Sequence, residues 1–120
     1  MINLSSMAAL SPSPIFSNYS GTKTFDNYFS KGLYYELRAK GVDVLTVLPG
    51  FVGTKLNGST PDLFKTITVE NCAKGILDKA TSFQTFGGNL HEVHGLIMRN
   101  LLLDLVPSPI LLKLNYAIDK

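Results

Sequence analysis

The pattern of apolar and polar positions predicts a strand, a loop and a long helix in the first third of the chain. Ile2–Ser6 passes from apolar into small polar residues, as a short strand does at its end, and residues 7–17 have the composition of a loop. From about Asn18 to Lys40, large apolar side chains recur every four residues, which is the spacing of one helical face. This apolar stripe is expected to pack in the core or against a second subunit, and it consists of Phe25, Tyr28, Phe29, Leu33 and Leu37.

The following segment predicts a buried strand. Gly41 is placed to cap the end of the long helix, and Val42–Leu48 is β-branched and mostly apolar, as in a strand covered on both faces of a parallel sheet. The remaining elements are expected at residues 68–80 (a helix with Thr68 as N-cap), 83–86 (a weaker third strand) and 91–105 (a helix), with a mobile loop over 53–61. Strand, long helix, buried strand and helix in this order predict an α/β layered sheet.

Composition narrows the class of protein. With 120 residues, the chain has the length of one small domain, and an apolar fraction of 45% argues against intrinsic disorder. The net charge of +2 is too small to indicate a nucleic-acid-binding surface, so no nucleic-acid partner is expected. The single cysteine, Cys72, cannot form an internal disulfide and is expected to be a small core residue. Together with His91 and His94 it offers too few ligands for a zinc site, so no metal is expected.

Neither a signal peptide nor a membrane span is expected. The N-terminal residues Met-Ile-Asn-Leu-Ser-Ser lack a basic region followed by a long apolar stretch. The most apolar segment, Leu96–Leu114, is interrupted by charged residues and prolines. We expect it to form a helix-turn-helix tail packed on the core or on a partner subunit, or alternatively to contact a membrane surface.

Two residues with complementary chemistry stand at the start of the long helix. Tyr19 and Lys23 are four positions apart, so their side chains project from the same helical face. An ammonium stabilises a nearby phenolate, and such a phenol can donate a proton to a ketone oxygen or accept one from an alcohol. The pair alone is common in helices, where it more often lies on a solvated face.

The surrounding sequence places this pair near two strand ends. Ser6 precedes Tyr19 by thirteen residues and lies at the C-terminal end of the first strand, and residues 49–54, Pro-Gly-Phe-Val-Gly-Thr, follow the next strand. Open α/β sheets bind ligands at the carboxyl ends of their strands. A proline followed by a glycine lets the backbone approach a flat ligand closely. We therefore expect both strand ends and the helix start to meet at one crevice.

Taken together, Ile-Asn-Leu-Ser-Ser, Tyr-Ser-Gly-Thr-Lys and Leu-Pro-Gly-Phe-Val-Gly-Thr resemble the short-chain dehydrogenase/reductase family over residues 1 to about 80. The Pro-Ser-Pro loop before Tyr19, the Phe-rich helix and the Leu/Pro-rich tail are most similar to its microsomal branch. That branch contains 3-ketoacyl-CoA reductases and 17β-hydroxysteroid dehydrogenase-like proteins.

The resemblance implies a role for each matching residue. Ser6 would hydrogen-bond the substrate carbonyl or hydroxyl, and Tyr19 would be the general acid in reduction and the general base in oxidation. Lys23 would stabilise the Tyr19 phenolate and bind the nicotinamide ribose. The nicotinamide ring and its carboxamide would be lined by Pro49, Gly50, Val52 and Thr54.

The resemblance also implies a Rossmann-like, doubly wound parallel sheet, of which this chain would be the C-terminal portion, with the N-terminal βαβ half missing. Residues 1–106 would form the catalytic half and residues 107–120 a C-terminal tail. The family's glycine-rich turn for the cofactor pyrophosphate belongs to that missing half, because Gly87-Gly88 lacks the strand-turn-helix setting it needs.

The implied function is an NAD(P)-dependent oxidoreductase that transfers a hydride to or from a keto or hydroxy group of a lipid-like substrate, such as a 3-ketoacyl-CoA or a steroid. NADP(H) is favoured over NAD(H). The branch implies association with the endoplasmic reticulum membrane, or otherwise a cytoplasmic protein, and the family implies a homodimer through the long helix. The alternative is a truncated, non-catalytic paralogue that acts through subunit or membrane-surface contacts.

Overall fold

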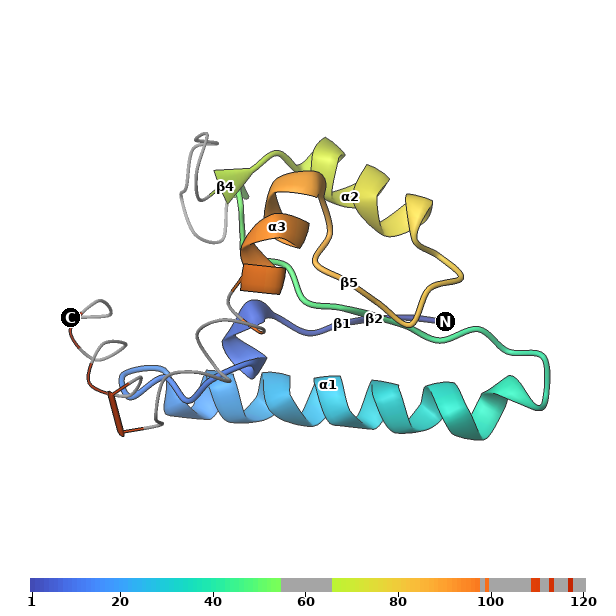
Figure 1. Ribbon diagram of the computed structural model, residues 1–120, viewed down its shortest axis with the longest axis horizontal. Helices are drawn as coiled ribbons and strands as arrows, with labels where there is room; N and C mark the ends of the chain where they lie inside the picture. Colours follow the sequence, from blue (N-terminus) through green and yellow to red (C-terminus); the bar gives the residue numbers. More distant parts are fainter. Residues whose placement is uncertain (55–65, 98, 100–108, 111–112, 114–116, 118–120) are drawn as a thin grey trace.

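The computed structural model describes residues 1–54, 66–97, 99, 109–110, 113 and 117. The elements along these residues are shown in Figure 1 and are, in chain order, β1 (Ile2–Leu4), the 3-10 helix η1 (Met7–Ala9), α1 (Ser17–Arg38), β2 (Leu45–Val47), β3 (Phe51–Val52), β4 (Thr66–Ile67), α2 (Val69–Asp78), β5 (Gln84–Thr85) and α3 (Asn89–Ile97).

A three-stranded parallel sheet with the strand order β1-β2-β5 lies at the centre of the molecule. Asn3 pairs with Thr46, and Val47 pairs with Thr85. In Figure 1, α1 runs along one side of this sheet, and α2 and α3 lie on the other side. The predicted α/β class with a layered parallel sheet is therefore confirmed, and the third strand expected over residues 83–86 is β5.

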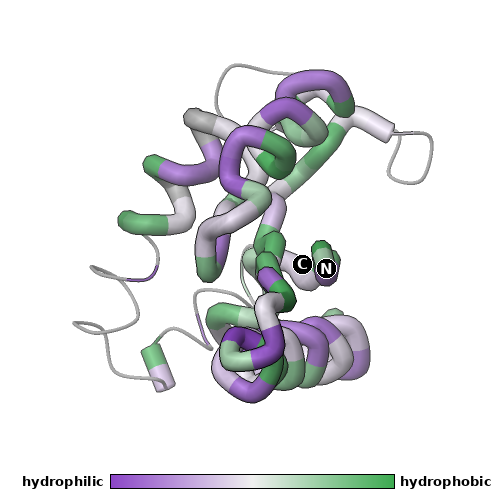
Figure 2. The backbone as a smooth tube through the Cα atoms, turned by 90° about the vertical axis from the view of Figure 1, so that its right-hand side faces the viewer, coloured by the Kyte–Doolittle hydropathy of each residue, from purple (hydrophilic) through white to green (hydrophobic). Residues whose placement is uncertain are grey.

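The central strand β2 and its flanking residues are the best-buried segment. All residues from Val44 to Leu48 are 0% exposed, as predicted for a strand covered on both faces. The strand begins later than predicted, because Val42 and Asp43 are exposed after the end of α1. The outer strand β1 is less protected: Ile2 and Leu4 are 44% and 57% exposed. Figure 2 shows the hydrophobic residues following the strands between the helical layers.

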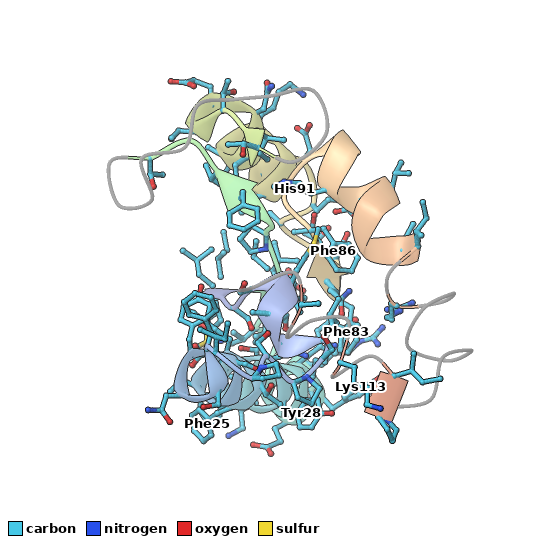
Figure 3. The ribbon with its side chains drawn as sticks, turned by 90° about the vertical axis from the view of Figure 1, so that its left-hand side faces the viewer. Phe25, Tyr28, Phe83, Phe86, His91 and Lys113 are labelled. Carbon is cyan, nitrogen blue, oxygen red and sulfur yellow. The ribbon has the colours of Figure 1, made fainter. Side chains whose placement is uncertain are left out.

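The helix α1 lies where it was predicted, but its apolar stripe does not pack in the core. Phe25, Tyr28 and Phe29 are 66%, 70% and 53% exposed, so the expectation of core packing is wrong for them. Figure 3 shows Phe25 on the side of α1 away from the sheet. Leu33 and Leu37 are partly buried. The residues of α1 that are buried are small and polar: Ser20, Asn27 and Ser30.

Turn and cap residues end and start the helices as expected. Gly41 has a φ of +73° and its N–H donates to the Arg38 carbonyl, which ends α1. Thr68 caps α2, because its hydroxyl accepts the Asn71 N–H at 3.2 Å. Cys72, inside α2, is buried as predicted. The short parallel pair of β3 and β4 was not predicted.

Three expectations lie wholly or partly outside the described residues. The loop expected over residues 53–61 falls mainly at positions 55–61, and the helix expected over 91–105 is described as α3 only as far as Ile97. The tail over 107–120 is described at four positions, 109–110, 113 and 117. Within the described parts of the chain, we find no helix with the length and apolar character needed to span a bilayer.

Candidate active site

Two hydrogen bonds fasten the start of α1 to the end of β1. The Ser5 hydroxyl donates to the Lys23 carbonyl oxygen at 2.6 Å, and the Lys23 ammonium donates to the Leu4 carbonyl oxygen at 3.3 Å. Both bonds join the last residues of the first strand to the second turn of the helix. The positive charge of Lys23 therefore lies at the carboxyl end of β1.

Tyr19 lies one helical turn before Lys23, and the two side chains are neighbours. Lys23 Nζ is 5.9 Å from the centroid of the Tyr19 ring, within the range of a cation–π contact. Tyr19 is 50% exposed, so a ligand can reach the phenol from the surface. Lys23 Nζ is also 3.6 Å from Asp26 Oδ2, an ion pair on the helix surface.

Ser6 lies at the same end of the sheet. Its hydroxyl caps η1 by accepting the Ala8 N–H at 3.1 Å. A hydroxyl that accepts one hydrogen bond still has its own hydrogen to donate. Leu4 and Ser5, the two residues before Ser6, both contact Lys23. Ser6 therefore lies near the N-terminal turns of α1.

The backbone after β2 runs beside the backbone after β1. The Ser5 N–H donates to the Val47 carbonyl at 2.7 Å, and the Met7 N–H donates to the Pro49 carbonyl at 3.0 Å. These two bonds continue the parallel pairing beyond the strand ends. Ser6 and Pro49 thus lie at the carboxyl ends of neighbouring strands, where the Lys23 side chain also reaches from α1 with Tyr19 beside it.

Residues 50–54 are held by the start of α3, a helix that the sequence predicted, and by β4, a strand that it did not predict. The Gly50 N–H donates to Nδ1 of His91, in the first turn of α3, at 3.2 Å. The Gly53 N–H donates to the Ile67 carbonyl at 2.9 Å, and Val52 lies in β3, which pairs with β4. Thr54 is exposed at the end of the segment. No sequence signal marks His91 for this role, because nothing in the pattern of the helix shows that it returns to the strand ends.

The donor set at this edge fits the nicotinamide end of a dinucleotide. The Lys23 ammonium has three N–H donors, of which the Leu4 carbonyl takes one, so it can also bind ribose hydroxyls. Thr54 offers an exposed hydroxyl. The missing side chain at Gly50 makes room for His91, since a Cβ there would meet Nε2 of that ring at 3.1 Å. Among the described residues, no three His, Cys, Asp or Glu side chains are grouped to hold a metal ion.

A hollow of about 670 Å³ lies elsewhere, on another flank of α1. None of the residues to which the sequence assigned a catalytic or cofactor-binding role lines it. We therefore take the strand ends, rather than this hollow, as the candidate active site. Its lining consists of residues 9–14 with Ser17, Ser20, Gly21, Thr24 and Tyr28.

Comparison with known protein families identifies the family of this chain. Residues 1–63 match the profile described as short chain dehydrogenase, and these residues include both strand ends and the start of α1. The chain belongs to the short-chain dehydrogenase family. Its parallel sheet with helices on both sides is accordingly part of the Rossmann-like fold of this family.

Relatives of this short-chain dehydrogenase point to one branch. Very-long-chain 3-oxoacyl-CoA reductase from Macaca fascicularis is 37% identical to this chain over 122 residues, and the enzyme of the same name from Homo sapiens is 37% identical over 121 residues. Each of the two matches covers 100% of this chain and 37% of the relative. The 17-beta-hydroxysteroid dehydrogenase type 3 from Danio rerio is 33% identical over 102 residues, covering 84% of this chain and 33% of that protein. These relatives confirm the resemblance to the branch of 3-ketoacyl-CoA reductases and 17β-hydroxysteroid dehydrogenase-like proteins.

The chain spans about 37% of the length of the first two relatives. Among solved structures, acetoin dehydrogenase from Enterobacter cloacae aligns with 80% of this chain and 34% of that chain, with a TM-score of 0.44 and 18% identity.

Proposed function

We propose that this chain carries the catalytic part of a short-chain dehydrogenase that interconverts a keto and a hydroxy group on a lipid-like substrate, such as a 3-ketoacyl-CoA or a steroid, with NADP(H). The observation that carries the proposal is that Tyr19 lies beside Lys23, whose ammonium binds Leu4 at the carboxyl end of β1, two residues before Ser6. Family membership supports a nicotinamide cofactor, and the names of the relatives support the substrate class. Residues 1–106 would form this catalytic part, with residues 107–120 as a tail.

In the direction of reduction, Tyr19 donates the phenol proton to the carbonyl oxygen of the substrate and later regains a proton from solvent through its exposed side. NADPH held at this site would supply the hydride that reduces the carbonyl carbon to the alcohol. The Ser6 hydroxyl donates a hydrogen bond to the same oxygen and orients the substrate. In oxidation the Tyr19 phenolate accepts the alcohol proton instead.

Lys23 supports both partners of the reaction. Its ammonium lies beside the Tyr19 ring, where a positive charge stabilises the phenolate formed during reduction. Its remaining N–H donors would bind the ribose hydroxyls next to the nicotinamide. The backbone of Pro49 and Gly50, with Val52 and Thr54, would line the ring and its carboxamide.

The Tyr19→Phe variant tests the proposal in the complete gene product that contains these residues. Turnover of ketones is followed by the nicotinamide absorbance, and loss of the hydroxyl should lower kcat by about two to four orders of magnitude. The dissociation constant for NADPH should change little, because the aromatic ring remains. Tyr35→Phe, a matched change at an exposed position of the same helix, should leave kcat unchanged.

The result also separates the two functions considered. Full turnover in Tyr19→Phe would reject the role of Tyr19 as general acid. A wild-type protein that neither binds NADPH nor turns over ketones would reject the enzyme and favour a non-catalytic paralogue.

We also propose a homodimer through α1 and association with the endoplasmic reticulum membrane. The exposed aromatic side chains of Phe25, Tyr28 and Phe29 support a subunit contact on the outward face of the helix.

The side chains of Leu96 and Ile97, each 45% exposed at the end of α3, support the contact with a lipid surface. Co-sedimentation with liposomes tests the membrane contact, and absence of binding would reject it.

A further inference from the structure

A buried histidine contacts the backbone assigned to the nicotinamide. His91 is 1% exposed, and its Nδ1 accepts the Gly50 N–H at 3.2 Å. A Cβ atom on Gly50 would lie 3.1 Å from Nε2 and 3.3 Å from Cε1 of the same ring. The imidazole therefore pairs with the Gly50 amide and also fills the space beside its Cα. Figure 3 shows His91 in the interior, above Phe86.

This hydrogen bond defines the chemical form of the ring. A histidine nitrogen that accepts a hydrogen bond carries no proton, so we assign His91 as neutral, with its proton on Nε2. A protonated ring would direct a second N–H at the Gly50 amide hydrogen and could not make this contact.

The helix turn that carries His91 is itself fixed to the central sheet. The Glu92 carboxylate accepts hydrogen bonds from the Thr85 hydroxyl and from the Phe86 N–H, the latter at 2.7 Å. The Glu92 N–H in turn donates to the Gly88 carbonyl at 2.7 Å. Since Thr85 lies in β5, which pairs with β2, the imidazole is held by the same sheet that carries the candidate active site.

We propose that His91 is a positioning residue that sets the orientation of the Pro49–Gly50 peptide toward the nicotinamide. The Pro49 carbonyl and the Gly50 N–H belong to one planar peptide unit. Met7 N–H binds its oxygen and His91 Nδ1 binds its hydrogen, so the unit is held at both ends and cannot rotate. The inference rests on the proposed function, because that function assigns the nicotinamide to this segment.

The test compares two substitutions that differ in the hydrogen-bond acceptor. His91→Leu removes the acceptor, whereas the amide oxygen of His91→Asn lies near the position of Nδ1 and retains it. In the complete gene product, His91→Leu should raise the dissociation constant and the KM for NADPH about tenfold, the equivalent of one hydrogen bond. The KM for the ketone should change less, and His91→Asn should recover most of the NADPH affinity.

A second measurement needs neither cofactor nor turnover. Amide hydrogen exchange at Gly50 in the ligand-free protein should be about tenfold or more faster in His91→Leu than in the wild type, and slow again in His91→Asn. The ring ¹⁵N chemical shifts of the wild type should show an unprotonated Nδ1. Equal exchange at Gly50 in wild type and His91→Leu, or a protonated Nδ1, would overturn the contact.

The outcomes separate this inference from the proposed function. If the wild type binds NADPH and His91→Leu binds it equally well, the positioning role fails and the enzyme stands. If the wild type does not bind NADPH, both fail. Where His91→Leu does not fold, His91→Gln replaces it. The amide oxygen of glutamine lies one methylene further out than that of asparagine, so it should not reach the Gly50 N–H. If His91→Gln bound NADPH as tightly as His91→Asn does, the inference would be overturned.

Discussion

Lys23 is the residue on which the contacts of the candidate site converge. Its carbonyl oxygen accepts the Ser5 hydroxyl, its ammonium donates to Leu4, and its Nζ lies beside the Tyr19 ring and 3.6 Å from Asp26. The side chain is 24% exposed, so the charge is held at the strand end rather than in open solvent. A surface ion pair of this kind contributes about 0–1 kcal/mol, so Asp26 is a weak competitor for the ammonium.

The Lys23→Gln variant should separate the charge of this residue from its hydrogen bonds. Glutamine can still donate to the Leu4 carbonyl, but it cannot stabilise a phenolate by charge. We expect kcat to fall by about tenfold to a hundredfold and the KM for NADPH to rise, with thermal unfolding nearly unchanged. Steady-state kinetics measure both, and Lys40→Gln, at an exposed position after α1, is the control. Wild-type kinetics in Lys23→Gln would contradict the assigned role.

The Cys72 thiol makes the stability of the folded protein depend on pH in the alkaline range. Burial raises the pKa of the Cys72 thiol above its ordinary value of 9.0. The folded state therefore keeps the thiol proton over a pH range in which the unfolded chain releases it. The contribution of the Cys72 thiol to stability is complete below its pKa in the unfolded chain, and it is lost as the pH rises through its pKa in the folded protein. Burial, followed by the charge of Arg99, lowers the pKa of Lys31, which acts in the opposite direction.

Comparison with Cys72→Ala isolates the thiol, since Lys31 is present in both proteins. The free energy of unfolding, measured with urea from about pH 8 to about pH 10, should fall more steeply with pH in the wild type than in Cys72→Ala. Parallel pH profiles would show that the thiol ionises equally in the folded and unfolded states.

At the scale of elements, the periodicity of the sequence identified α1 but not the face that it buries. A repeat of apolar residues every four positions shows that a helix forms, and it does not say what covers the stripe. The small side chains of Ser20 and Ser30 let the helix approach its neighbours closely, and their hydroxyls donate to the carbonyls of Ser11 and Asp26. These two serines are thereby buried at little cost, which hydropathy alone does not reveal.

The site was predictable to the extent that it depends on strand ends. Ser6 and Pro49 follow strands that the sequence indicates, and parallel pairing then brings them together. The contact of His91 with Gly50 joins residues 41 positions apart. It depends on the return of α3 to the strand ends, and no local pattern encodes that path.

The contact of α3 with Phe86 depends on a glycine. A Cβ on Gly95 would overlap three ring atoms of Phe86, which is 1% exposed. Gly95→Ala should therefore push the helix away from the ring and lower the free energy of unfolding by about 1–3 kcal/mol.

A matched glycine in α1 should respond in the opposite direction. Around a Cβ on Gly21, no heavy atom of the described residues comes within 4 Å, apart from its chain neighbours and the local helix backbone. Gly21→Ala should therefore stabilise the protein by about 0.5–1 kcal/mol through helix propensity. Urea unfolding of both variants tests the pair, and a loss of stability in Gly21→Ala or none in Gly95→Ala would contradict the packing described.

At the scale of the molecule, an aromatic surface lies on the outward face of α1. The rings of Phe25 and Phe29 stack with their centroids 5.7 Å apart, and the neighbouring Tyr28 is 70% exposed. Aromatic side chains of this kind are enriched in protein interfaces, which is why we place the proposed subunit contact here.

Charge placed on this surface should separate the subunits without unfolding them. Phe25→Glu combined with Phe29→Glu should raise the dissociation constant of the dimer by about a hundredfold, since both side chains would lie at the contact. Sedimentation equilibrium measures the dissociation constant, with Lys40→Glu, beyond the end of α1, as the control. A wild type that is monomeric throughout would reject the dimer, and a double variant that remains dimeric would locate the contact elsewhere.

The strand order of the central sheet has a consequence for how the protein acquires its fold. Ile2 pairs with Leu45 only after the whole of α1 has been made, and Thr46 pairs with Gln84 only after a second long stretch of chain. Helical turns form in microseconds or less, whereas such distant pairings require large loops to close first. During synthesis on the ribosome, the edge of β2 that pairs with β5 must therefore wait until residues 84–85 have emerged, and in this interval the nascent polypeptide is exposed to aggregation and needs a chaperone.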